Sequence, residues 1–289
     1  MASFSQWVAA ARLRTLPMAI APVVVGSAAA AELEAFHAGK ALLALVVALA
    51  LQVGVNYSND YSDGIRGTDD TRVGPFRLTG SGASTPHTVR NMAFAFYGLA
   101  AVAGLALTIW AQAWWLIIIG VAAIAAAWFY TGGSKPYGYL GLGEVFVFIF
   151  FGLVAVLGTT YTQAGQVSGL AVTGAVGAGL VSTALLMANN VRDIPTDIEA
   201  AKMTLAVRLG DTKARWSYPV MLAIAIGVPL LYAQEHPWMW LMLIMLVVSV
   251  RPSLIMLEAE ERGELIPVLK MTGLFGILYA VVFTLGIVL

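Results

Sequence analysis

Hydrophobic residues form long, nearly unbroken stretches along almost the whole chain, and short polar segments separate them. Each stretch approaches the ~20 residues that a helix needs to cross about 30 Å of hydrocarbon. The stretches lack the apolar–polar alternation of barrel strands, so their backbone groups are predicted to pair within helices. The pattern therefore predicts an all-α polytopic membrane protein, a bundle of about nine transmembrane helices that forms a single domain over residues 1–289.

Only a polar break around Gln112 separates the third predicted span from the fourth, so a count of eight also fits the pattern. The nine predicted spans lie near residues 16–34, 40–60, 90–110, 113–131, 141–162, 169–191, 216–233, 238–257 and 266–288.

The composition agrees with a membrane protein and excludes several classes of site. Charged residues make up 11% of the chain and hydrophobic residues 60%, whereas a soluble domain carries about 25% charged residues. The net charge of zero provides no basic field for nucleic acid. The absence of cysteine excludes disulfides, thiolate catalysis and cysteine-ligated metal centres.

The Lys and Arg residues are distributed unequally between the two sides of the predicted bundle. The N-terminal segment and the loops after the second, fourth, sixth and eighth spans hold 15 of the 16, and only Lys40 falls on the other side. Cytoplasmic loops carry such an excess in membrane proteins. We therefore expect a multi-pass protein of the cell (inner or plasma) membrane, with a cytoplasmic N-terminus and an outer C-terminus. The long loops 2–3 and 6–7 would form a cytoplasmic cap.

Two clusters of acidic and amide side chains occur at the cytoplasmic ends of the second and sixth predicted spans. The first, NYSNDYSDGIRGTDD, places Asn56 and Asp60 four residues apart, and the second, NNVRDIPTD, repeats this spacing with Asn189, Asp193 and Asp197. Residues four apart share one face of a helix. Ionisable side chains at membrane depth are costly and usually mark a functional site. The loop TGSGAST, which follows the first cluster, is predicted to be only a linker.

Two such faces pointing at each other would gather carboxylate and amide oxygens. Mg²⁺ commonly combines a few carboxylates with substrate phosphates, and the same loops hold basic groups that bind phosphate. The combination predicts a Mg²⁺ site for a phosphorylated substrate. The alternative interpretation is a set of loop salt bridges and interfacial anchors. The basic candidates are Arg72, Arg77, Arg192, Lys202 and Arg208.

These motifs resemble the UbiA superfamily of intramembrane aromatic prenyltransferases. That family carries an Asn/Asp-rich motif, often NDxxDxxxD, after its second helix and a second Asp-rich motif after its sixth. Here the stretches NDYSDGIRGTD, YTGGSKPYGYLGLGE and NNVRDIPTDIEAAKMTLAVRLG are similar, in this order, to the branch that prenylates 1,4-dihydroxy-2-naphthoate in menaquinone synthesis. The chain departs from the motif at its last position, which falls on Gly67, and Asp69 or Asp70 is the candidate to replace it.

The resemblance implies a Mg²⁺-dependent reaction between a polyprenyl diphosphate and 1,4-dihydroxy-2-naphthoate. The prenyl group would replace the carboxylate of the naphthoate ring, with loss of carbon dioxide and pyrophosphate, to give demethylmenaquinone. Mg²⁺ and basic side chains would stabilise the charge that develops on pyrophosphate. Aromatic side chains would shield the allylic cation from water, and the isoprenoid tail would stay in membrane lipid.

The resemblance also implies roles for individual residues. Lys135 and Tyr137, in GGSKPYGY, would cover the site or meet the naphthoate carboxylate, although Lys135 alternatively serves as a membrane anchor. The predicted Mg²⁺ ligands are Asn56, Asp60, Asp63, Asn190, Asp193 and Asp197. The candidate catalytic residues are Asp60, Asp63, Asp193, Asp197 and Lys135. The candidate substrate contacts are Asn56, Asn59, Arg72, Tyr137, Asn190, Lys202 and Arg208.

Three other functions compete with this interpretation. A secondary transporter is the main alternative from a different class, but transporters place their polar residues near the bilayer midplane, whereas these gather at the cytoplasmic ends. A lipid phosphotransferase would require the motif DGxxAR, and here DG is followed by IRG. A prenyltransferase that acts on 4-hydroxybenzoate or homogentisate is the nearest rival, and only the branch motifs argue against it.

Overall fold

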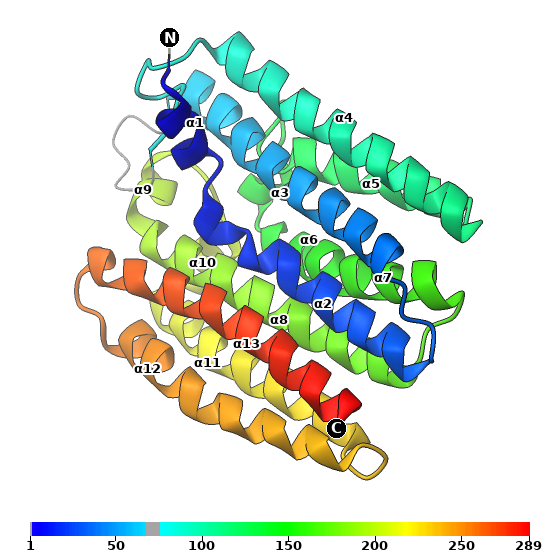
Figure 1. The fold of residues 1–289 in the computed structure, drawn as a ribbon. Helices are drawn as coiled ribbons and strands as arrows, with labels where there is room; N and C mark the ends of the chain where they lie inside the picture. Colours follow the sequence, from blue (N-terminus) through cyan, green and yellow to red (C-terminus); the bar gives the residue numbers. More distant parts are fainter. Residues whose placement is uncertain (1, 68–75) are drawn as a thin grey trace.

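The computed structural model describes residues 2–67 and 76–289, in which helices joined by turns and loops form the whole fold (Figure 1). No β-strand occurs among the described residues. The elements are α1 (Phe4–Ala10), η1 (Leu13–Thr15), α2 (Pro17–Glu32), α3 (Ala38–Arg66), α4 (Pro86–Ala111), α5 (Leu116–Phe129), η2 (Tyr137–Leu140), α6 (Gly143–Val147), η3 (Phe148–Val154), α7 (Ala155–Ala164), α8 (Gly169–Arg192), α9 (Ile194–Glu199), α10 (Leu205–Leu209), α11 (Asp211–Gly227), η4 (Val228–Tyr232), η5 (Pro237–Leu243), α12 (Ile244–Glu258), η6 (Arg262–Leu265) and α13 (Ile266–Val288).

The prediction of a polytopic helical membrane protein is confirmed, whereas the count of nine spans stays a prediction. In the described part of the chain, seven helices are long and apolar enough to cross a membrane, and a pair bent by 49°, Phe4–Thr15 with Pro17–Glu32, gives an eighth. The candidate for the ninth is α5, which has 14 residues. At 1.5 Å per residue it spans about 21 Å, less than the ~30 Å of a hydrocarbon core.

The helix α8 lies at the centre of the bundle. In the most apolar 18-residue stretch of α8, 72% is buried inside the protein. The corresponding share is 44% or less in each of the other six long helices of the described chain. Figure 1 shows α3, α4 and α5 on one side of it and α11, α12 and α13 on the other. The largest apolar core joins α8 to α11 and α13, and a separate core joins α3 to α4 around Val53 and Tyr97.

One predicted span contains a segment that is not α-helical. Residues 143–164 form α6, then a π-helix over Phe148–Val154 (η3), then α7. At Gly152 this segment approaches α8 so closely that a Cβ atom would lie 2.5 Å from the Cα atom of Gly179. Glycine is therefore required by this packing, because any side chain at position 152 would push η3 away from α8.

Candidate active site

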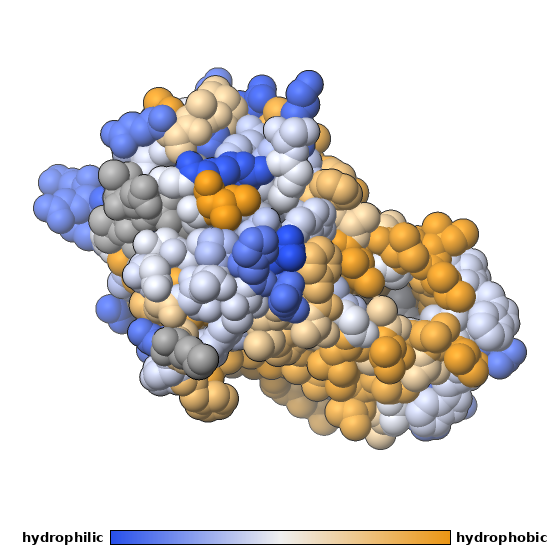
Figure 2. All heavy atoms as spheres, turned by 90° about the horizontal axis from the view of Figure 1, so that it is seen from above, coloured by the Kyte–Doolittle hydropathy of each residue, from blue (hydrophilic) through white to orange (hydrophobic). Residues whose placement is uncertain are grey.

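A cavity of about 1030 Å³ opens between the α3–α4–α5 side of the bundle and α8. We call the end of the bundle formed by the last turns of α3 and α8 and by η2 the polar end. Figure 2 shows polar side chains gathered over one end of the molecule, with a hydrophobic band that extends away from it. The cavity begins among polar residues of the polar end and continues between apolar residues such as Val47, Ile124, Phe150 and Val154.

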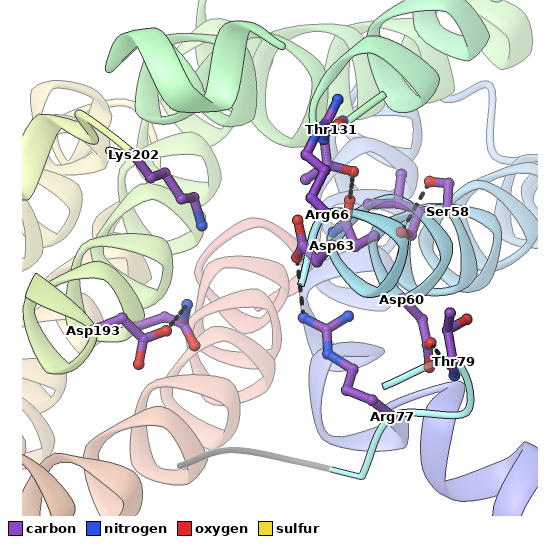
Figure 3. A network of polar contacts seen from close by, with 12 residues as sticks. Ser58, Asp60, Asp63, Arg66, Arg77, Thr79, Thr131, Asp193 and Lys202 are labelled. Carbon is purple, nitrogen blue, oxygen red and sulfur yellow. Dashed lines mark hydrogen bonds and ion pairs between the residues drawn. The ribbon is translucent and has the colours of Figure 1, made fainter. Parts of the chain in front are cut away.

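Asp60 holds a loop in place and does not line the cavity. Its side chain is 1% exposed, and its two oxygens accept hydrogen bonds from the backbone N–H groups of Leu78 (2.7 Å) and Thr79 (2.8 Å) (Figure 3). The segment around Thr79, predicted to be only a linker, is thus fastened to α3 through this carboxylate. In the described structure both carboxylate oxygens of Asp60 accept backbone hydrogen bonds, and its role as a Mg²⁺ ligand stays a prediction.

Asp63, one helical turn further along α3, lines the cavity. Its Oδ2 atom lies 3.3 Å from Nη2 of Arg77, and its Oδ1 atom accepts a hydrogen bond of 3.0 Å from the hydroxyl of Tyr139. Asp63 belongs to α3, Arg77 to the loop after it and Tyr139 to η2, so the Asp63 carboxylate connects three segments of the chain. Asp63 is 4% exposed, and the guanidinium of Arg77 places an opposite charge beside its carboxylate.

The amide side chains that line the cavity differ in which atom the protein already uses. Asn56 donates from Nδ2 to the Ala11 carbonyl (2.9 Å) and to Oγ1 of Thr15 (3.0 Å). Its Nδ2 is thereby committed to the break between α1 and α2. Its Oδ1 accepts only a long hydrogen bond of 3.5 Å from Nε2 of Gln52, and an amide oxygen has a second lone pair that suits a hard cation.

Asn190 and Asn59 show opposite arrangements. Asn190 donates from Nδ2 to Oε1 of Glu144 (2.8 Å), whereas Asn59 uses its Oδ1 to accept the Thr131 hydroxyl (2.8 Å). Asn190 therefore keeps its amide oxygen for a ligand such as Mg²⁺, and Asn59 keeps its NH₂ group for a ligand such as a phosphate oxygen. This division fits the predicted roles of Asn56 and Asn190 as Mg²⁺ ligands and of Asn59 as a substrate contact. These roles, and the predicted substrate contacts of Asn56 and Asn190, stay predictions.

The two aspartates of the second motif form ion pairs with neighbouring basic side chains. Arg192 binds Asp193 through two hydrogen bonds, Nε to Oδ1 (2.7 Å) and Nη2 to Oδ2 (2.8 Å), and Arg192 itself lines the cavity. Asp197 lies 3.5 Å from the ammonium of Lys202 and accepts a hydrogen bond of 3.3 Å from Thr204. Neither aspartate lines the cavity, so the cations Arg192 and Lys202 stand between these carboxylates and the space in which a ligand would bind.

The balance of charge around the cavity favours an anion. Among the described residues that line it, Asp63 is the only carboxylate, and six residues are cationic. The described residues contain no group of three or more His, Cys, Asp or Glu side chains that could hold a metal ion by themselves. The donor set still fits Mg²⁺ when a diphosphate supplies further ligands, because Mg²⁺ commonly takes only one or two protein carboxylates. The six cationic residues are Arg12, Arg14, Arg77, Arg192, Lys202 and Lys270.

The remaining predicted residues fall in different places. Tyr137 lines the cavity and donates its hydroxyl to the carbonyl of Ala126 (2.9 Å), and burial raises its pKa, so the phenol stays protonated. Lys135 is exposed and lies outside the cavity lining. Arg208 is also exposed and donates from Nε to the carbonyl of Met203 (3.1 Å). Arg72, Asp69 and Asp70 lie outside the described residues.

An aromatic wall continues the site toward the apolar part of the cavity. The rings of Tyr137 and Phe146 stack with centroids 4.0 Å apart, and those of Phe146 and Phe150 follow at 6.1 Å. All three line the cavity. Phe150 belongs to the π-helix η3, so the irregular backbone of this span carries part of the wall. Such a wall can shield a carbocation from water and can also pack against a flat acceptor ring.

Comparison with known proteins gives the family. The model of the UbiA prenyltransferase family matches residues 19–287 of the chain. The chain belongs to this family. A protein of Mycobacterium tuberculosis (strain ATCC 25618 / H37Rv) named 1,4-dihydroxy-2-naphthoate octaprenyltransferase is 54% identical over 280 residues, which cover 97% of this chain and 96% of that protein. A protein of the same name from Escherichia coli (strain K12) is 35% identical and covers 98% and 95%.

Solved structures of UbiA proteins share the fold. The apo structure of a UbiA homologue from Aeropyrum pernix K1 has a TM-score of 0.72 at 14% identity, with 96% of this chain and 98% of that one covered. A UbiA homologue from Archaeoglobus fulgidus, bound to DMAPP and Mg²⁺, has a TM-score of 0.67 at 15% identity, with 98% and 100% covered. These structures show the shared fold, and the match of the family model over residues 19–287 confirms the predicted resemblance to the UbiA superfamily.

Sequence reasoning missed two residues of this UbiA site. Tyr139 bridges the two halves of the polar end, and Arg66 donates from its guanidinium to the carbonyls of Thr131 and Gly133. Both lie inside stretches that carried the family resemblance, but nothing in their type or spacing distinguished them from membrane anchors. Their contacts are long-range in sequence, and only the fold brings the partners together.

Proposed function

We propose that this chain transfers a polyprenyl group from polyprenyl diphosphate to 1,4-dihydroxy-2-naphthoate, with loss of carbon dioxide and pyrophosphate. The observation that carries the proposal is the cavity itself, which joins a cation-rich polar end to a long apolar interior. A polyprenyl diphosphate has the same two parts. The names of the relatives at 54% and 35% identity support the choice of acceptor within the UbiA family.

The side chains of the polar end suit the ionisation of an allylic diphosphate. The allylic C–O bond breaks, its electron pair leaves with pyrophosphate, and Arg77, Arg192 and Lys202 stabilise the charge that develops there. When Mg²⁺ is bound, it supplies further electrostatic stabilisation of the diphosphate. The residues that would hold it are Asp63, Asn56 and Asn190, which together provide one carboxylate and two amide oxygens.

The acceptor half of the reaction forms one C–C bond and breaks another. The naphthoate carbon that carries the carboxylate takes the allylic carbon, and the carboxylate leaves as carbon dioxide, so its bonding electrons restore the aromatic ring. The product that balances is the hydroquinone, demethylmenaquinol, and the demethylmenaquinone expected from the sequence requires a separate two-electron oxidation. Tyr137, Phe146 and Phe150 provide an aromatic surface beside which this step can exclude water.

The polar end faces the cytoplasm on this proposal. Arg12, Arg66, Arg77, Arg192 and Lys202 all lie at that end, and a cytoplasmic excess of Lys and Arg is the general rule for membrane proteins. A soluble naphthoate then enters from the cytoplasm of the cell, while the isoprenoid tail enters from the membrane.

The proposal is tested by a competition assay on the purified full chain in nanodiscs. The assay contains geranylgeranyl diphosphate with equal amounts of 1,4-dihydroxy-2-naphthoate and 4-hydroxybenzoate, with or without Mg²⁺, and mass spectrometry identifies the products. The expected product is a decarboxylated prenyl-naphthohydroquinone or its quinone, formed only with Mg²⁺. Prenylated hydroxybenzoate would keep the family chemistry and overturn the acceptor, and no prenylated product would overturn the proposed reaction.

A further inference from the structure

Tyr139 lies between the two motifs and contacts both of them. Its hydroxyl donates to Oδ1 of Asp63 (3.0 Å), and its backbone carbonyl accepts a hydrogen bond from Met203 N–H (3.1 Å). Its ring lies 5.3 Å from the guanidinium carbon of Arg66 and 5.4 Å from the ammonium nitrogen of Lys202. One side chain in η2 therefore links the last turn of α3 to the loop that follows α9.

These contacts act on two groups with different tasks. Asp63 is the carboxylate that lines the cavity, and Lys202 is a cation that lines it from the opposite side (Figure 3). A hydroxyl that donates to a carboxylate fixes the direction of its oxygens, and an aromatic face within about 6 Å attracts an ammonium group. Lys202 also forms an ion pair with Asp197, 3.5 Å away and outside the cavity lining, so the ring and this carboxylate both hold its ammonium group.

We propose that Tyr139 is a positioning residue that serves the two halves of the diphosphate site separately. Its hydroxyl orients Asp63 for Mg²⁺, and its ring, together with Asp197, holds Lys202 at the cavity lining where the diphosphate would bind. The inference rests on the proposed function, because it takes a prenyl diphosphate with Mg²⁺ as the ligand of this cavity. It adds a residue that neither spacing nor motif had singled out.

Two substitutions separate the tasks. Y139F keeps the ring and removes the hydroxyl, so the Mg²⁺ concentration that gives half-maximal binding should rise about tenfold, the effect of losing a hydrogen bond to a charged group. The affinity for the diphosphate at saturating Mg²⁺ should stay within about twofold of the wild type. Y139L removes both groups, so the Mg²⁺ requirement should rise equally and the diphosphate affinity should also fall about threefold to fivefold.

The experiment measures binding without turnover. Isothermal titration calorimetry on the full chain in nanodiscs uses geranylgeranyl thiolodiphosphate, in which sulfur replaces the bridging oxygen, first at varied Mg²⁺ and then at saturating Mg²⁺. The matched controls are Y161F and Y161L. Tyr161 is half-buried, packs edge-on against Trp115 at 5.1 Å and lies outside the cavity lining, so both controls should bind like the wild type.

The outcomes separate the two proposals. Equal Mg²⁺ requirements in the wild type and Y139F, or tighter Mg²⁺ binding in Y139F, would overturn the positioning role while leaving the proposed function intact. A wild type that binds the thiolodiphosphate neither with nor without Mg²⁺ would overturn both. If Y139L does not fold, as judged by its unfolding temperature, the split between Mg²⁺ requirement and diphosphate affinity in Y139F still decides the matter.

Discussion

At the residue scale, Asp60 and Asp63 show how one motif divides its work. They are three residues apart on α3, and both are almost fully buried. Asp60 uses its two oxygens to accept the backbone N–H groups of Leu78 and Thr79, whereas Asp63 lines the cavity beside Arg77. A carboxylate that satisfies two buried N–H groups stabilises the fold, since unpaired buried donors are costly.

This division predicts different results for two isosteric substitutions. D60N turns an NH₂ group toward one of two backbone donors, so we expect unfolding to become easier by about 1–3 kcal/mol, with the Mg²⁺ requirement of the folded fraction unchanged. D63N should instead raise the Mg²⁺ concentration needed for half-maximal turnover. Thermal unfolding in nanodiscs and Mg²⁺ titration of prenyl transfer provide the two measurements. A shifted Mg²⁺ requirement in D60N with wild-type stability would contradict the structural role and support the predicted role of Asp60 as a metal ligand.

The sequence could identify Asp60 and Asp63 as members of one site because spacing along a helix is a local property. It could not distinguish their tasks, because the partners Leu78 and Tyr139 are 18 and 76 residues away from the aspartates that they contact. The loop TGSGAST gave no sign of this role, since a backbone N–H group has no side-chain signature. Asp193, whose oxygens are held by Arg192, illustrates the same limit at closer range.

At the element scale, the span of residues 143–164 differs most from an ideal helix. Its apolar run predicted a continuous span at 141–162, and the structure contains η3 there instead. A π-helix has no hydrophobic period of its own over a single turn, so a run of apolar residues conceals it. π-helical turns are frequently found at functional sites, and here the turn carries Phe150 of the aromatic wall.

The contact between Gly152 and α8 gives a prediction for this element. A Cβ atom at position 152 would lie 2.5 Å from the Cα atom of Gly179 and 2.7 Å from the carbonyl oxygen of Ala175, both backbone atoms that cannot rotate away. G152A should therefore destabilise the protein by about 1–3 kcal/mol through overpacking. The control G158A lies on the same span, where nothing comes within 4 Å of the added atom. Equal unfolding temperatures for the two variants would show that η3 does not need this close approach.

At the scale of the whole molecule, α4 and α5 are the two elements whose crossing of the membrane decides the number of spans. The chain leaves the polar end with α4, turns at Gln112, and returns through the short α5 to Thr131, which bonds Asn59 at the polar end. The hydrophobic pattern marked both elements as spans, and their length distinguishes them: α4 has 26 residues and α5 has 14. Sequence periodicity fixes the apolar character of α5 but not the point at which its helix ends.

The absence of cysteine makes this arrangement directly testable, because single cysteines introduce the only thiol. Ser81 and Ser134 are exposed at the polar end, and Gln112 and Gln166 are exposed in turns at the other ends of α4 and α7. In intact cells, a membrane-impermeant maleimide should label Q112C and Q166C but not S81C and S134C, and permeabilised cells should give all four. Labelling of S134C in intact cells would contradict a cytoplasmic polar end, and protection of Q112C would contradict a crossing by α4 and α5.

The cationic lining of the cavity also has a consequence for what happens after the reaction. On the proposed function, the substrate is a lipid held by its charged head, and the transfer splits it into a small anion and an uncharged lipid. Pyrophosphate leaves to water, while the new prenyl-naphthohydroquinone no longer carries the group that Arg77, Arg192 and Lys202 bind. The reaction itself therefore removes the charged group by which the site binds the lipid. Pyrophosphate then partitions into water and the prenylated product into the membrane, and no separate release step is needed.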